Sequence, residues 1–308
     1  KTYEDARSYI AGGDTLVFTR GLGIKKNSVV LPAGYEVVSV NYPSQVRQEA
    51  DGRLQLSFMN IGPAEVPYVV KARRIGAGGA PPTSQRTTRP TVDRNPSIAT
   101  GSTPTASAPV ATSTAEPDPT RDPRLGERAR QDREIVYFLQ PPETSAFDLY
   151  HDYTESRVGV GRYLNVVRAG SRVSNPSAYI LDTGEPATVR TLRGSAIADA
   201  KVDIGGPVTS ESEVVVIDFR APAAGESVRL RISETYTDPA RYRLQGGMLV
   251  WDRGFGRPAN AMVLPAGWSL TNCSVPATVT PTDDGRTRLD FLNPRNDEIS
   301  VLVTARRR

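Results

Sequence analysis

The sequence contains one long internal duplication, and this repeat limits the folds that the chain can adopt. Residues 1–74 align with residues 234–307 at an offset of 233 without a gap, and 29 of the 74 aligned positions are identical. The best-matched segments are 20–23 with 253–256, 30–34 with 263–267 and 51–53 with 284–286. We call these stretches the first copy and the second copy, and we call residues related by the offset counterparts.

Each copy has the pattern of a β-meander, because short apolar runs alternate with turn residues and no 3.6-residue period appears. In the first copy we expect strands over residues 16–19, 28–31, 36–40, 54–59 and 66–72. The Asp-Gly pairs at 51–52 and 284–285 predict tight hairpin turns. The alternation of Val66, Tyr68 and Val70 predicts a strand with one buried face.

The chain before the second copy continues this pattern. Strands are expected over residues 135–139, 163–167, 178–181, 187–192, 214–219 and 228–232. About eleven strands over residues 133–308, without a clear helix, predict an all-β fold, a β-sandwich with immunoglobulin-like or Greek-key connectivity. The single cysteine argues against the disulfide of an antibody-type domain.

A low-complexity segment separates the two β regions. Residues 76–120 contain 34 Gly, Pro, Ala, Ser or Thr in 45 positions, too little apolar surface to offset the entropy of ordering. We therefore predict an N-terminal β module over 1–75, an extended Pro/Thr/Ser/Ala-rich linker over 76–132 and a C-terminal β domain over 133–308. Residues 121–134 fit either a short solvated helix or an irregular loop.

The two copies differ in what precedes them. About 100 residues of β-rich chain lie before the second copy, whereas the first copy begins at Lys1. Three explanations remain open: a longer precursor is processed or truncated before Lys1, the short unit folds alone, or its open edge pairs with another chain. No secretion signal is visible at Lys1.

Residues with catalytic or metal-binding chemistry are scarce. His151 and Cys273 are the only histidine and cysteine, so a histidine-based zinc site is not expected. We interpret His151, within a polar segment over 150–155, as a surface-loop residue, with a general base or a metal ligand as the alternative. Cys273 is interpreted as a core thiol. No catalytic residue, cofactor or metal is predicted.

Several other motifs are assigned to turns or strands. The Arg-Gly-x-Gly segments at Arg20 and Arg253 are read as turns, because a phosphate loop would need a following helix. The Leu-Pro-Ala-Gly segments predict strand exits packed under Tyr35 and Trp268. In an alternative interpretation Tyr35, Trp251 and Trp268 are exposed and contact a glycan or a partner.

Charge and hydropathy exclude two further classes. The net charge is +4, but basic residues are interleaved with 34 carboxylates, so no nucleic-acid partner is expected. The longest aliphatic run, over 214–217, is far too short to cross a membrane. Arginine outnumbers lysine 33 to 5, which fits a GC-rich bacterial genome.

These features predict a non-enzymatic structural or interaction protein. We expect an extracytoplasmic accessory subunit, in the periplasm or at the cell surface, that clamps a large envelope or membrane complex; respiratory and photosynthetic complexes are the candidates. Its linker would lie as a strap on the other proteins of that complex through Pro81, Pro82, Pro90, Pro104 and Pro109. The alternatives are a surface fibre or layer protein, a glycan-binding adhesion module, and a hydrolase with a site near His151.

Overall fold

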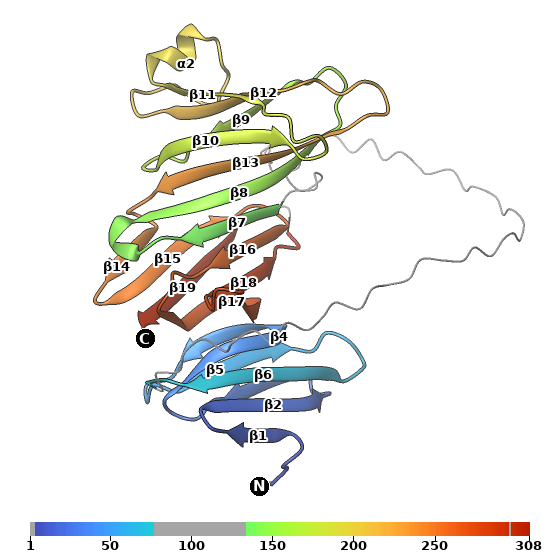
Figure 1. The fold of residues 1–308 in the computed structure, drawn as a ribbon, viewed down its shortest axis with the longest axis vertical. Helices are drawn as coiled ribbons and strands as arrows, with labels where there is room; N and C mark the ends of the chain where they lie inside the picture. Colours follow the sequence, from blue (N-terminus) through green and yellow to red (C-terminus); the bar gives the residue numbers. More distant parts are fainter. Residues whose placement is uncertain (1–3, 77–133, 296) are drawn as a thin grey trace, which may run out of the picture. The chain divides into compact units, whose positions relative to one another are not determined.

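The computed structural model describes residues 4–76, 134–295 and 297–308, and this part of the chain is all-β (Figure 1). Its helical elements are the short α2 (Ser195–Asp199) and the 3-10 turn η1 (Pro142–Thr144). The described residues fall in one compact unit. The expected linker, with all five of its candidate contact prolines, lies outside the described residues apart from Gly76, as does the possible helix over 121–134 apart from Glu134.

The first copy forms six strands. They are β1 (Tyr9–Gly12), β2 (Thr15–Leu22), β3 (Lys26–Val30), β4 (Tyr35–Gln48), β5 (Leu54–Met59) and β6 (Val66–Arg74), paired in the order β1-β2-β6-β4-β5-β3. The long β4 pairs with β6 through residues 35–40 and with β5 through residues 45–48. One strand therefore belongs to both parts of the sheet, as happens where a strand turns the corner of a β-sandwich.

The second copy repeats these strands with the same bounds at the same offset. They are β14 (Tyr242–Gln245), β15 (Met248–Phe255), β16 (Ala259–Val263), β17 (Trp268–Pro281), β18 (Thr287–Leu292) and β19 (Ile299–Arg307). The pairing order, β14-β15-β19-β17-β18-β16, is also the same. Both expected Asp-Gly turns are confirmed, since Gly52 and Gly285 have φ angles of 83° and 77°.

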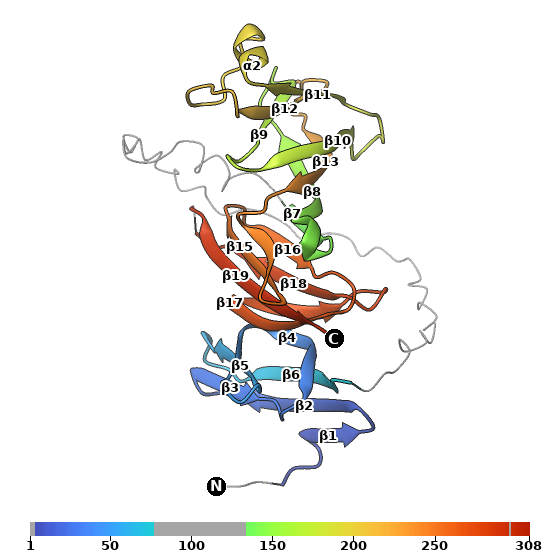
Figure 2. The same cartoon turned by 90° about the vertical axis from the view of Figure 1, so that its left-hand side faces the viewer.

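Seven further strands precede the second copy. They are β7 (Glu134–Leu139), β8 (Ala146–Glu155), β9 (Arg162–Val166), β10 (Arg172–Ile180), β11 (Thr188–Arg193), β12 (Glu213–Asp218) and β13 (Val228–Thr237). β7 pairs in parallel with β16, and β8, β13 and β10 follow in antiparallel order (Figures 1 and 2). β9, β12 and β11 form a separate three-stranded sheet. The second copy thus lies in the middle of the large sheet, with β7, β8, β13 and β10 on one side and the first copy on the other.

The two copies meet through β4 and β17, which pair with a pseudo-two-fold pattern. Val46 lies opposite Cys273, and Val40 lies opposite Val279. Since Cys273 is the counterpart of Val40 and Val279 is the counterpart of Val46, exchanging the two copies turns one pair into the other. Ser44 lies opposite its own counterpart Ala277. Residues that face their own counterparts lie on the axis of such an interface, as in an isologous dimer.

The Arg-Gly-x-Gly segments are strand ends, so the prediction of turns was wrong. Arg20 and Gly21 lie in β2, and Arg253 and Gly254 lie in β15. A Cβ atom on Gly21 would lie 2.3 Å from Glu65 Oε2, and one on Gly254 would lie 2.3 Å from Glu298 Oε2. A larger residue at either position would force this glutamate side chain, which passes close over the strand, to move.

Candidate functional site

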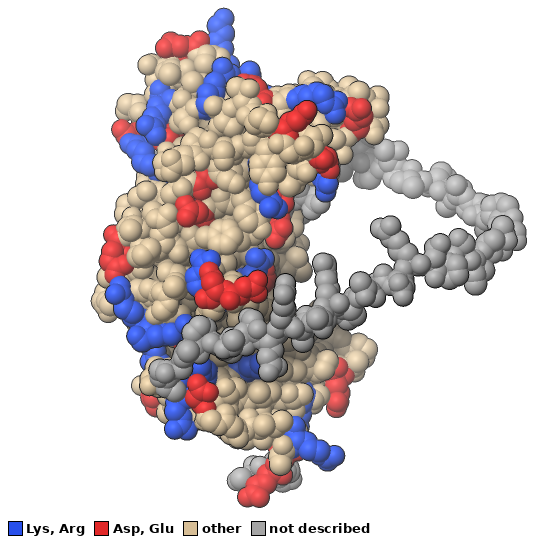
Figure 3. Space-filling model, in the orientation of Figure 1, with Lys and Arg blue, Asp and Glu red and all other residues tan. Residues whose placement is uncertain are grey.

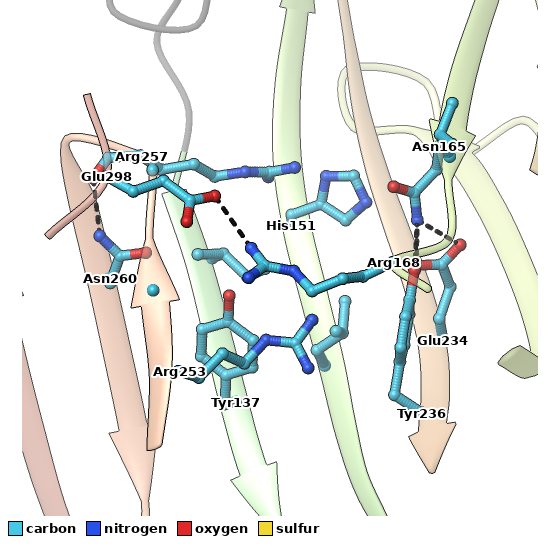
Figure 4. A pocket seen from close by; sticks show the side chains of 15 residues that line it. Tyr137, His151, Asn165, Arg168, Glu234, Tyr236, Arg253, Arg257, Asn260 and Glu298 are labelled. Atoms are coloured by element: carbon cyan, nitrogen blue, oxygen red, sulfur yellow. Dashed lines mark hydrogen bonds and ion pairs between the residues drawn. The ribbon is translucent and has the colours of Figure 1, made fainter. Parts of the chain in front are cut away.

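A polar cavity of about 130 Å³ lies among β7, β8, β9, β13, β15, β16 and the segments that follow β9 and β15 and precede β19 (Figure 4). It gathers several charged and amide side chains in one place. Its polar lining comprises Tyr137, His151, Asn165, Arg168, Glu234, Tyr236, Arg253, Arg257, Asn260 and Glu298. This cavity is the strongest candidate for a small-molecule site in the described part of the chain.

Glu234, on β13, is a buried carboxyl group, 3% exposed. Asn165 Nδ2 donates to both of its carboxylate oxygens, at 2.9 and 2.7 Å. Burial raises the pKa of Glu234 to about 7, although the Asn165 hydrogen bond and the positive charge of Arg257 act in the opposite direction. Glu234 therefore takes up and releases its proton near neutral pH.

Arg253, on β15, holds the opposite side of the cavity. Its Nη1 donates to Oδ2 of the fully buried Asp238 at 2.9 Å. The guanidinium lies over the ring of Phe147 at 5.0 Å and over that of Tyr236 at 5.6 Å from the ring centroids. These contacts make Arg253 a structural cation packed against buried aromatic rings.

Arg257 and Asn260 offer polar atoms to the cavity. Arg257 Nη1 and Asn260 Oδ1 are buried and have no hydrogen-bond partner within residues 4–76, 134–295 and 297–308. Asn260 Nδ2 donates to the Arg257 carbonyl at 2.7 Å, which fixes the two residues relative to each other. Figure 4 shows the imidazole of His151 between Arg257 and Asn165. A donor and an acceptor beside a titratable carboxyl group suit the binding of a small polar molecule.

The lining does not form a recognisable catalytic set. No serine, cysteine or lysine nucleophile is among the described residues around the cavity. The same part of the chain has no group of three or more His, Cys, Asp or Glu side chains placed to hold a metal ion. Arg168 is engaged with Glu298 at 2.9 Å.

We predict that replacing Glu234 by glutamine removes a pH dependence of stability. Between about pH 4.5 and pH 7 the unfolded chain ionises Glu234 whereas the folded chain keeps its proton, so the folded state loses stability as the pH rises. The free energy of unfolding of the wild type relative to E234Q should fall by up to about 3 kcal/mol over this window. Urea unfolding at pH 4.5, 6 and 8 measures this difference, and parallel profiles would contradict the prediction.

The structure places the candidate residues from the sequence differently from most expectations. His151 lies in the middle of β8 and is 1% exposed, so the surface-loop interpretation was wrong. Trp251 and Trp268 are 0% and 4% exposed, and neither presents a ring face to a glycan or a partner. Tyr35 is half-buried, with the Arg74 guanidinium 5.5 Å from its ring centroid.

Cys273 is confirmed as a core thiol. It is 1% exposed on β17, and burial raises its pKa to about 12. A thiol with so high a pKa carries almost no thiolate at neutral pH and is a poor nucleophile.

Sequence reasoning missed Glu234, Arg253 and Asn165 as cavity residues. Arg253 carried a usable signal, because it occupies an inward position between Trp251 and Phe255 in the alternation of β15. A charged residue at an inward strand position predicts a buried polar site.

Charged residues on the surface do not form a single-sign patch on the face drawn in Figure 3, where acidic and basic side chains lie beside one another. This agrees with the interleaving in the sequence. No helix within the described ranges has the length and apolarity needed to span a membrane.

No protein-family model and no curated protein matches the chain. Among solved structures it is similar to an M1 zinc metallopeptidase from Deinococcus radiodurans, with a TM-score of 0.33 and 15% identity over 56% of this chain and 40% of the enzyme. A mutant of an M1 zinc metallopeptidase from the same organism gives a TM-score of 0.34 and 16% identity over 56% of this chain and 41% of the enzyme. The chain spans about two fifths of the length of these enzymes.

Proposed function

We propose that this chain is a non-enzymatic structural protein that binds other proteins through the edges of its β-sheets. The observation that carries the proposal is the pairing of β4 with β17, in which one copy already recognises the other strand against strand. Main-chain pairing between modules is the interaction by which β proteins assemble with extended partners.

The site geometry supports this function over the two alternatives that need a ligand site, a glycan-binding module and a hydrolase near His151. A glycan platform requires exposed aromatic faces, whereas Trp251 and Trp268 are packed in the core. A hydrolase near His151 would use a cavity of about 130 Å³, which is below the size typical of substrate pockets. The partner is proposed to be a large, membrane-associated assembly outside the cytoplasm.

The proposal is tested by the native mass and subunit content of the particle that carries the chain. Envelope extracted in mild detergent is separated by size-exclusion chromatography, and the chain is followed by a specific antibody. Elution with other proteins in a fixed stoichiometry is the expected result, with cell fractionation placing the particle outside the cytoplasm. Elution as a monomer at all salt concentrations would overturn the proposal.

A further inference from the structure

The strands β3 and β16 are counterparts, yet they have different neighbours. β16 lies between β18 and β7, and its pairing with β7 is parallel (Figures 1 and 2). β3 pairs with β5 alone within the described ranges. The first copy therefore has an open strand edge at the position where the second copy holds β7.

The backbone groups on this open edge are defined by the bonds on the other side of β3. Leu31 N–H donates to the Leu54 carbonyl, and Asn60 N–H donates to the Lys25 carbonyl. In an antiparallel pair the bonded residues alternate, so Asn27 and Val29 also bond toward β5. The N–H and C=O groups of Lys26, Ser28 and Val30 face away from β5.

The second copy shows how a side chain from the added strand is received. Tyr137 of β7 lies opposite Met262 and packs on Trp251 and Phe255, with ring centroids 5.2 and 5.4 Å apart. The Arg253 guanidinium lies 6.0 Å from the centre of the same ring. Tyr137 and the four residues around it are all at most 9% exposed.

The first copy has a cavity of about 400 Å³ at the corresponding place. It is lined by the counterparts of all four residues that surround Tyr137, namely Phe18, Arg20, Leu22 and Val29. The edge beside it is also more open, since Val30 is 42% exposed whereas its counterpart Val263 is 1% exposed. This cavity has the lining and the position of an empty aromatic subsite.

The occupant must match the chemistry of this edge. The chain between residues 77 and 133 has no aromatic residue, so it cannot supply the ring. The first residue of β7 is Glu134, which lies opposite Ala259, whereas the counterpart of Ala259 is the exposed Lys26. An acidic residue three positions before the aromatic would therefore meet a lysine on the first copy.

We propose that β3 binds an extended segment of a partner protein as a parallel strand. The segment places an aromatic ring in the cavity beside Phe18 and Leu22, aliphatic residues two positions to either side, and an acidic residue opposite Lys26. The inference rests on the proposed function and specifies the partner segment that it requires.

The probe is a fluorescent peptide with the sequence of residues 134–140, titrated into the full chain and followed by anisotropy. We expect saturable binding that weakens at least tenfold when the tyrosine of the peptide is replaced by alanine. Hydrogen exchange should show new protection over residues 26–30 and not over 259–263. Binding that displaces β7 from β16, or that is unchanged by loss of the tyrosine, would overturn the proposal.

Ser28→Pro supplies the protein-side test, because it removes an N–H that faces the partner and proline is tolerated on an edge strand. Ala11→Pro is the matched control on the opposite edge of the first copy, where the Thr19 N–H to Ser8 carbonyl bond shows that the Ala11 N–H also faces away from its neighbour. S28P should lose at least tenfold in affinity and A11P should not, and equal effects would overturn the inference.

Sedimentation of the peptide-free chain separates the remaining outcomes. A concentration-dependent dimer that the peptide dissociates would show that a second copy of the chain occupies β3, which overturns the assigned partner. If the chain elutes from envelope extracts as a monomer but still binds the peptide, the proposed function is wrong and the β3 site is supported. The two failures are therefore distinguishable.

Discussion

Replacing Arg253 by methionine is expected to lower the free energy of unfolding by about 3–5 kcal/mol, because it leaves a buried carboxylate without its nearest cation. Asp238 is 0% exposed and lies 2.9 Å from Arg253 Nη1, whereas its other cation, Arg241, is 3.4 Å away. The variant also loses the contacts of the guanidinium with Phe147 and Tyr236. Methionine is chosen because it keeps most of the side-chain volume.

The counterpart in the first copy provides the control. Arg20 also precedes a glycine near the end of its strand, but it is exposed and forms no ion pair within the described residues. R20M should change the free energy of unfolding by less than about 0.5 kcal/mol. Denaturant unfolding of both variants at pH 7 makes the comparison. Similar losses of unfolding free energy in R20M and R253M would show that the strand position, and not the buried ion pair, causes the destabilisation.

Truncation of Trp251 to alanine is expected to cost about 3–5 kcal/mol through the loss of buried aromatic contacts. The indole is 0% exposed and lies within 5.2 Å of the ring centroids of Tyr137 and Phe147. Because Tyr137 belongs to β7, the loss should also loosen the pairing of β7 with β16. Hydrogen exchange of residues 134–139 should therefore rise together with the fall in thermal stability.

Trp251→Phe is the matched control, because it installs the residue that the first copy has at this position. Trp251 Nε1 is buried without a hydrogen-bond partner in the described ranges, so removing it abandons no polar contact there. We expect W251F to retain most of the stability that W251A loses. A W251F variant as unstable as W251A would show that shape and not aromatic packing dominates this position.

The strands of the two copies were predictable from sequence because their inward positions are almost all apolar. Residues 54–59 were expected as a strand, and β5 has these bounds with Leu56 and Phe58 buried on one face. The short β1 was missed, because its four residues are all exposed and have no apolar face to produce an alternation.

β8 was missed for the opposite reason. Its buried face carries Phe147, Leu149, His151, Tyr153 and Glu155, so two polar residues interrupt the apolar alternation. Glu155 is accommodated because Arg157 and Tyr153 donate to its carboxylate; although burial acts to raise its pKa, these bonds hold the pKa at about 2. The alternation of apolar residues therefore fails to predict a strand whose buried polar side chains are hydrogen-bonded by residues elsewhere in the chain.

The cavity itself could not be derived from sequence. Its residues come from six strands and connecting segments, and their proximity depends on the order of β7, β8 and β13 beside β16. Neighbouring strands of a sheet are not fixed by the alternation within each strand. Glu234 illustrates this limit. The strand was expected to end at residue 232, where the apolar pattern stops, but β13 continues through Glu234 to Thr237.

The joining of both copies in one polypeptide allows their contact to be chemically unequal. Glu36 is 3% exposed and accepts hydrogen bonds from Ser269, Arg73 and Arg308; burial acts to raise its pKa, but these donors hold the pKa below its ordinary value. Ser269 is the counterpart of Glu36. In a symmetric dimer of the first copy, Glu36 would meet a second Glu36, and two buried carboxylates would repel each other. Duplication within one chain permits an acid on one side and a hydroxyl donor on the other, and the covalent link makes their association independent of protein concentration.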